Sequence, residues 1–77
     1  MKIVLRVRLD EILKERNMTQ KELVELIKEK LDKDVRTASI SELYNNQRKS
    51  LNKELIENIA SALEISNINE FITFDVK

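Results

Sequence analysis

The stretch 36–46 carries the side chains best suited to recognising another molecule. Ile40 and Leu43 lie three residues apart, which predicts a short helix with one buried edge. The other positions hold small or hydrogen-bonding side chains, namely Thr37, Ala38, Ser39, Ser41 and Glu42. A helix of about two and a half turns with short donors and acceptors fits the major groove of B-DNA. We therefore predict a DNA-reading helix at about 36–45; the alternative is an ordinary surface helix.

Catalytic chemistry has few candidate groups in this chain. Histidine, cysteine and glycine are all absent. The commonest general base, a reactive thiolate and a glycine-rich phosphate loop are therefore missing from the sequence. The acidic residues are spread along helical faces that we predict to be exposed. We therefore reject an enzyme and expect no cofactor, no metal site and no small-molecule ligand.

The charges are polarised along the chain, although the net charge is zero. Residues 1–53 hold 13 Lys/Arg and 9 Asp/Glu, a net of +4, whereas residues 54–77 hold one Lys and five acids, a net of −4. A basic half that contains the candidate helix is compatible with nucleic-acid binding. No apolar run has the length of a membrane span, so we expect a cytoplasmic protein that does not contact membranes.

Alternating and helical periods predict the elements that position this helix. Residues 2–9 and 72–76 alternate as strands, and the two strands should pair and lie against the helices. Between them we predict helices at 9–16, 20–30, 36–45 and 53–63, and one helical turn at 67–71. Asn17 is predicted to adopt a left-handed conformation, Thr19 with Glu22 to form a capping box, and Asn52 to be an N-cap.

The chain is predicted to be one domain, 1–77, with a small apolar core. The predicted core residues are Ile12, Leu23, Val35, Ile40, Leu43, Leu55, Ile59 and Leu63. The last three of these residues and Ala60 are expected to form the apolar stripe of the fourth helix, with Ile56 beside it. Tyr44 has two interpretations, because its hydroxyl suits a phosphate and its ring suits the edge of the core.

Three segments resemble the Cro/C1-type (XRE-like) helix-turn-helix family of phage-repressor proteins. They contain Thr-Gln-Lys-Glu-Leu at 19–23, Ser-Ile-Ser at 39–41 and Ile-Ala-Ser-Ala-Leu at 59–63. The resemblance covers about residues 8–71 and implies a mostly α, lambda-repressor-like bundle of four to five helices, here with a short two-stranded β-ribbon formed by the terminal segments. The sequence departs from the family at Val24, where a small residue is usual, at Asp34, where glycine is usual, and by extra residues between Leu23 and Ile40. These extra residues predict a longer second helix and a looser connection.

The resemblance implies a role for individual residues. The base-contacting residues would be Thr37, Ala38 and Glu42. The phosphate-contacting residues would be Gln20, Arg36, Ser39, Asn45, Arg48 and Lys49. Threonine can hydrogen-bond a base or place its methyl group on thymine, alanine suits a thymine methyl, and glutamate can accept from cytosine N4.

Two functions of different classes follow from this pattern. The first is a sequence-specific transcriptional regulator, a repressor that binds double-stranded DNA as a homodimer on two half-sites. The alternative is a protein-interaction or antitoxin-like subunit of the same fold, whose ribbon edge pairs with a strand of a partner.

Overall fold

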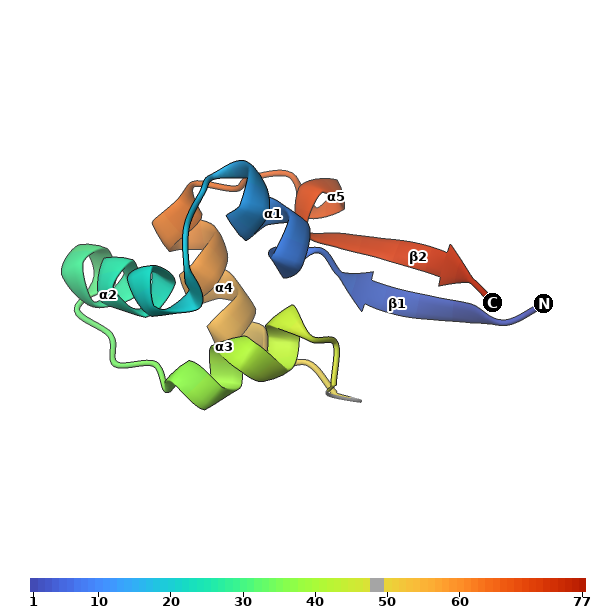
Figure 1. Cartoon of the computed structure of the whole chain (residues 1–77), viewed down its shortest axis with the longest axis horizontal. Coiled ribbons are helices and arrows are strands. Elements are labelled where there is room, and N and C mark those ends of the chain that lie inside the picture. The colour runs from blue at the N-terminus through green and yellow to red at the C-terminus, as the bar shows by residue number, and fades with distance from the viewer. Residues whose placement is uncertain (48–49) are drawn as a thin grey trace.

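The computed structural model describes residues 1–47 and 50–77, which form five helices and one two-stranded antiparallel sheet (Figure 1). The elements in chain order are β1 Ile3–Val7, α1 Leu9–Glu15, α2 Gln20–Leu31, α3 Thr37–Tyr44, α4 Lys53–Leu63, α5 Ile68–Phe71 and β2 Ile72–Val76. This architecture confirms the predicted fold class. Within the described residues, no helix is long and apolar enough to cross a membrane.

Side-chain caps set where the helices begin. The Thr19 hydroxyl accepts a hydrogen bond from the Glu22 amide at 3.0 Å, and the Glu22 carboxylate accepts one from the Thr19 amide at 2.9 Å. The hydrogen bond that the Thr19 backbone amide donates to the Glu22 carboxylate, followed by the interaction of that carboxylate with the Thr19 side chain, holds the pKa of Glu22 below its usual range. The Asn52 side chain likewise accepts from the Leu55 amide at 3.1 Å. Both predicted caps are confirmed, and the box fixes Gln20 as the first residue of α2.

Among the described residues, four have a left-handed backbone, and the chain changes direction at each of them. Asn17 has φ of 53° and Asn46 has φ of 54°; asparagine tolerates this conformation better than most residues. Asp32, which ends α2, and Glu64, which ends α4, have φ of 53° and 57°. The prediction for Asn17 is confirmed, whereas the left-handed conformations at Asp32 and Glu64 were not predicted.

The core lies between the helices, and thirteen buried apolar residues of the described ranges form it. They are Val7, Leu9, Ile12, Leu13, Leu23, Ile27, Ile40, Leu43, Leu55, Ile59, Ala62, Leu63 and Phe71. Every predicted core residue is buried except Val35, which is half-buried in the connection before α3. Ala62, rather than Ala60, completes the buried stripe of α4. Tyr44 is half-buried and packs against this core.

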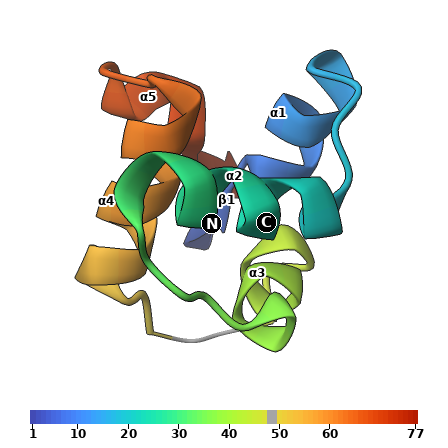
Figure 2. The same ribbon diagram turned by 90° about the vertical axis from the view of Figure 1, so that its left-hand side faces the viewer.

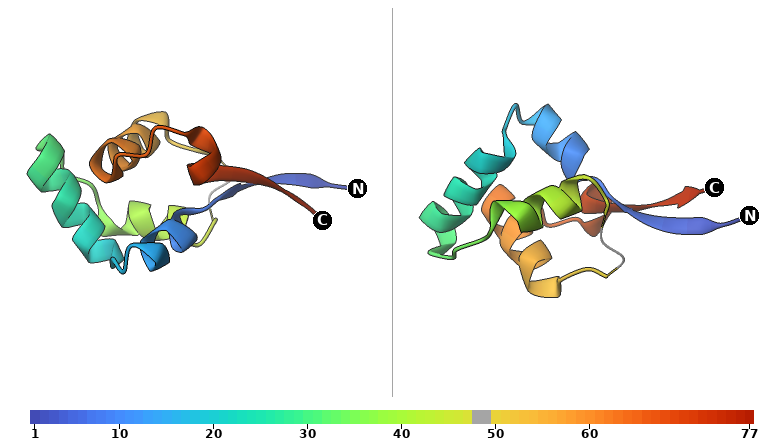
Figure 3. Two further views of the ribbon diagram at one scale, coloured as in Figure 1. Left: turned by 90° about the horizontal axis from the view of Figure 1, so that it is seen from above. Right: turned by 60° about the horizontal axis from the view of Figure 1, so that its bottom comes forward.

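The ribbon pairs as predicted but extends away from the helices. β1 and β2 are antiparallel, with Leu5 opposite Phe74 at the centre of the register. The Arg8 amide donates to the Phe71 carbonyl at 2.7 Å, so pairing begins at the edge of the core. Each further pair lies about 3.4 Å farther from the bundle. The prediction that the ribbon lies against the helices is therefore wrong, and Figure 3 shows it projecting freely.

Candidate nucleic-acid interface

α3 lies on the outside of the bundle with one face uncovered. Ile40 and Leu43 are buried and anchor it against α1 and α2. Figure 2 shows α3 at the lower edge of the bundle, below α2 and with α4 to its left, and the right-hand view of Figure 3 shows that no other described helix or strand crosses its outer side. The short side chains on that side can therefore approach a flat or grooved surface.

The predicted base-contacting residues are in two different environments. Thr37 and Ala38 are exposed in the first turn of α3. Glu42 is four residues after Ala38, on the same face of the helix, but it is half-buried and lines a hollow of about 280 Å³ between α3 and β1. The structure thus brings Thr37 and Ala38 together on an open surface of α3. Glu42 lies where that surface meets the ribbon.

Of the predicted phosphate-contacting residues that the structure describes, three lie in α3 or at its ends. Arg36 is exposed at the N-cap, and Asn45 is exposed at the C-cap, where its amide donates to the Ser41 hydroxyl at 3.3 Å. Ser39 is half-buried and lines, with Arg36, a hollow of about 220 Å³ beside the start of α4. Gln20 is half-buried at the start of α2. Arg48 and Lys49 lie outside the described residues.

Several cations are held by acids of the same chain. Lys28 Nζ lies 3.2 Å from Asp32 Oδ1 and 3.5 Å from Asp34 Oδ1, in the connection that leads to α3. Arg36 and Lys21 form no ion pair within the part of the chain that the structure describes. Their charges therefore remain available to an anion such as a phosphate.

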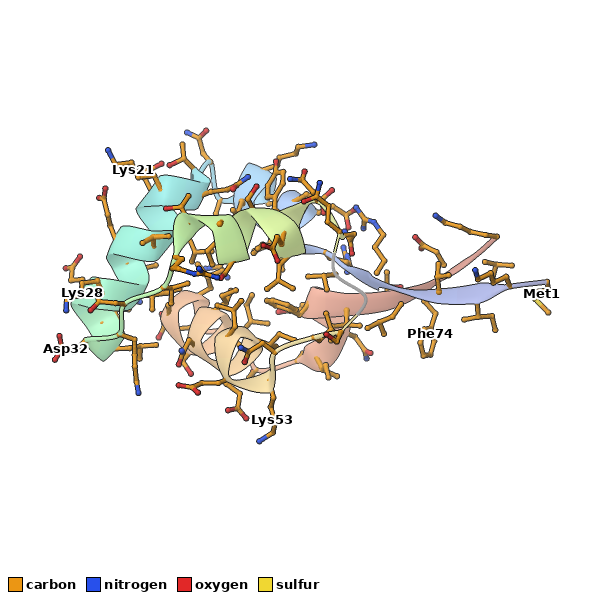
Figure 4. The ribbon with its side chains drawn as sticks, turned by 90° about the horizontal axis from the view of Figure 1, so that it is seen from below. Met1, Lys21, Lys28, Asp32, Lys53 and Phe74 are labelled. Carbon is orange, nitrogen blue, oxygen red and sulfur yellow. The ribbon has the colours of Figure 1, made fainter. Side chains whose placement is uncertain are left out.

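Lys21 and Ser41 were not assigned a role from the sequence. Lys21 is exposed at the second position of α2, next to Gln20, and Figure 4 shows it at the end of α2 beside α3. The sequence could have indicated Lys21, because it lies in the capped first turn of α2, at 19–23, where backbone amides favour an anion. Ser41 shares the outer face of α3 with Asn45 and is joined to it by the hydrogen bond above.

The basic side chains near β1 serve the fold instead. Arg6 bonds both carboxylate oxygens of Asp10, at 3.0 and 2.8 Å, and Glu11 at 2.8 Å. Arg8 Nε donates to the same Glu11 carboxylate at 2.9 Å. Hydrogen bonds from Arg8 and then Arg6 lower the pKa of Glu11. This cluster joins the end of β1 to α1.

The arrangement of α2 and α3 is that of a small helix-turn-helix DNA-binding protein, in which α2 supports the exposed helix α3. Residues 8–77 match the family described as the Cro/C1-type HTH DNA-binding domain, and the chain belongs to this family. The matched region begins just after β1 and includes β2. The protein is therefore a DNA-binding regulator. No curated protein and no solved structure matches the chain.

Proposed function

We propose that this protein is a sequence-specific transcriptional repressor, in which residues 1–77 act as one DNA-binding domain in the cytoplasm. The observation that supports this most directly is the arrangement of α3. Ile40 and Leu43 are buried on its inner edge, while Thr37 and Ala38 are exposed on the outer face beside Arg36, which is also exposed. A repressor acts by occupying DNA, which requires no further catalytic group.

In this proposal the first turn of α3 enters the major groove. Thr37 hydrogen-bonds a base edge or packs its methyl group on thymine, and Ala38 contacts a thymine methyl. Glu42 accepts from a cytosine amino group at the edge of the site nearest to β1. The half-burial of Glu42 makes it the weakest of the three assignments.

The surrounding polar residues would fix the orientation of α3 on the DNA backbone. We assign phosphate contacts to Gln20, Arg36, Ser39, Asn45, Arg48 and Lys49, and we add Lys21 to this set. Contacts of this kind supply affinity that falls with salt and carry no sequence information themselves. A homodimer on two half-sites about one helical turn apart would double both kinds of contact.

Binding to DNA of random sequence at several salt concentrations tests this proposal. Fluorescence anisotropy of a labelled random duplex should show log affinity falling linearly with log salt, with a slope equivalent to several released counterions. Selection from a random duplex pool should then enrich one motif. Absence of binding at low salt would refute DNA recognition, and binding without an enriched motif would refute sequence specificity.

The exposed ribbon supports a second function that is compatible with the first. Four apolar side chains of β1 and β2, Ile3, Leu5, Phe74 and Val76, are exposed, which suits contact with another protein chain. If the random duplex does not bind, the antitoxin-like or partner-binding role becomes the better account of this fold.

A further inference from the structure

The two faces of the ribbon differ in character. The register Ile3↔Val76, Leu5↔Phe74 and Val7↔Ile72 places only apolar side chains on one face. The opposite face carries Val4, Arg6, Thr73 and Asp75. Arg6 on that polar face is engaged by Asp10 and Glu11 of α1, so its charge is already neutralised within the chain. The apolar face has no such partner among the described residues beyond its base.

The outer part of the apolar face is largely exposed. Ile3, Leu5, Phe74 and Val76 are 57%, 47%, 71% and 67% exposed. With about 200 Å² for a fully exposed large side chain, these four residues present roughly 500 Å² of contiguous, mainly apolar surface. The largest apolar patches on monomeric proteins are about 300–600 Å² and are often functional. Figure 4 shows the Phe74 side chain projecting from the ribbon, clear of the helices.

We infer that this face binds the same face of a second copy of the chain, an inference that rests on the proposed function for its role. Two such faces would bury roughly 1,000 Å² in total, which is about the size that a specific protein interface needs to reach. In a two-fold dimer the residue on the axis meets its own copy, so a charge there would be repelled by itself. This face has no charged residue, and Leu5 and Phe74 form its centre.

The width of the bundle determines how the two ribbons run. Packed sheets are about 10 Å apart, whereas the two shorter dimensions of the molecule are 21 and 19 Å. Two bundles at the same end of the paired ribbons would therefore overlap. With the bundles at opposite ends, the tip of each ribbon lies over the base of the other. Beside the base lies the hollow of about 280 Å³, which the second copy would approach with the tip of its ribbon. Its lining is mostly apolar but includes two polar side chains: Val4, Leu5, Val7, Leu43 and Leu51, with Glu42 and Asn46.

This arrangement gives a spacing that suits DNA. The molecule is 42 Å long, and the five-residue ribbon accounts for about 17 Å of that length. A two-fold axis through the centre of the ribbon places the centres of the two helical bundles on the order of 40 Å apart. This is near the spacing of about 34–36 Å between half-sites one turn of DNA apart. The ribbon thus provides the dimer that a two-half-site regulator needs.

Sedimentation equilibrium of the full chain over micromolar to millimolar concentrations tests the interface. The wild type should have a mass of about 18 kDa, twice the 9.1 kDa of one chain, and Phe74→Glu should have the mass of one chain. Ile68→Glu is a matched control, because Ile68 is 69% exposed but lies on α5. A monomeric wild type, a dimeric Phe74→Glu variant or a monomeric Ile68→Glu variant would overturn the inference.

A cross-linking measurement keeps the test independent of the folding of Phe74→Glu. The natural chain has no cysteine, so Leu5→Cys introduces one thiol close to the expected axis. A short bismaleimide should join two Leu5→Cys chains at low concentration, because it spans the separation of about 10 Å between packed sheets. Thr73→Cys, on the opposite face, should remain single. Equal cross-linking of the two variants would contradict a face-specific dimer.

Binding to DNA separates this inference from the proposed function. On a duplex with two half-sites, Phe74→Glu should bind about 10²–10⁴-fold more weakly than the wild type, because linked binding is lost. On a single half-site the two proteins should bind equally. A wild type that binds DNA as a monomer overturns the ribbon interface alone. A dimer that binds no DNA supports the interface and overturns the proposed function.

Discussion

Asn46 connects the end of α3 to the ribbon, and its replacement tests how firmly the DNA-facing helix is held. Its side-chain amide donates to the Val7 carbonyl at 3.0 Å, and its side-chain oxygen accepts from the Val7 amide at 2.7 Å. The residue also has a left-handed backbone, with φ of 54°. Asn46→Gly removes both hydrogen bonds while glycine keeps that backbone conformation without strain. The substitution therefore isolates the contribution of the two bonds.

The expected loss follows from these two contacts. A hydrogen bond within a protein contributes about 0.5–1.5 kcal/mol net, so the free energy of unfolding should fall by about 1–3 kcal/mol. For a chain of this size each kcal/mol lowers the melting temperature by about 4–8 °C. Asn46→Ala should cost about 1–2 kcal/mol more, because alanine does not tolerate the left-handed conformation.

Thermal unfolding followed by circular dichroism provides the measurement, and Asn17→Gly is the control. Asn17 has nearly the same backbone conformation, φ of 53°, but its side chain forms no hydrogen bond with the described residues. Asn17→Gly should therefore change the melting temperature much less than Asn46→Gly. Equal melting temperatures for the two variants would refute the assignment of stability to the Val7 bonds.

Three further predictions concern DNA recognition and pH. Arg36→Ala should weaken binding to all DNA sequences about equally and reduce the slope of log affinity against log salt by about 1. Arg16→Ala, which removes the same charge beside α5, should change neither the affinity nor the slope. Fluorescence anisotropy at several salt concentrations measures both variants, and an Arg36→Ala loss that depends on DNA sequence would contradict a phosphate contact. Thr37→Ala or Glu42→Ala should change preference at a single base pair by about 1–3 kcal/mol, and an unchanged motif in pool selection would refute the base contact in question. Because the pKa of Glu11 is lowered in the folded chain, its contribution to stability is present above its unfolded pKa and is lost as pH falls through the folded pKa. The melting temperature should therefore fall on acidification below about pH 4.3, and by less in Glu11→Gln; equal falls in the two proteins would count against this role of Glu11.

Local signals in the sequence were sufficient for the elements and most of the core. The capping box at Thr19 and Glu22 needs only two residues three apart, and the helical spacing of Leu55, Ile59 and Leu63 specifies one face of α4. Both depend on contacts within a single element. For the same reason the predicted bounds of β2 were confirmed, and those predicted for α3, about 36–45, differ by one residue at each end from the observed Thr37–Tyr44.

Contacts between distant segments could not be obtained from such patterns. The bonds between Asn46 and Val7 join residues 39 apart in the chain. Alternation in β1 shows that Leu5 shares a face with Val7, but it does not show how far the helices extend over that face. For this reason the sequence wrongly predicted that the ribbon lies against the helices. Glu42 is a similar case, because a helical wheel places it outward, whereas in the structure it is half-buried and lines a hollow together with residues of β1.

The end of α3 links the proposed DNA site to the proposed dimer interface. Leu43 is buried in the core and lines the hollow at the base of the ribbon, and Asn46 bonds β1 directly. A second copy seated on the ribbon would therefore be fixed relative to the same turn that fixes α3. Because affinity for two half-sites depends on the spacing of the two recognition helices, stiffness at this junction should favour DNA with one spacing over DNA with another. The few contacts between ribbon and helices would then matter for the choice of operator as well as for stability.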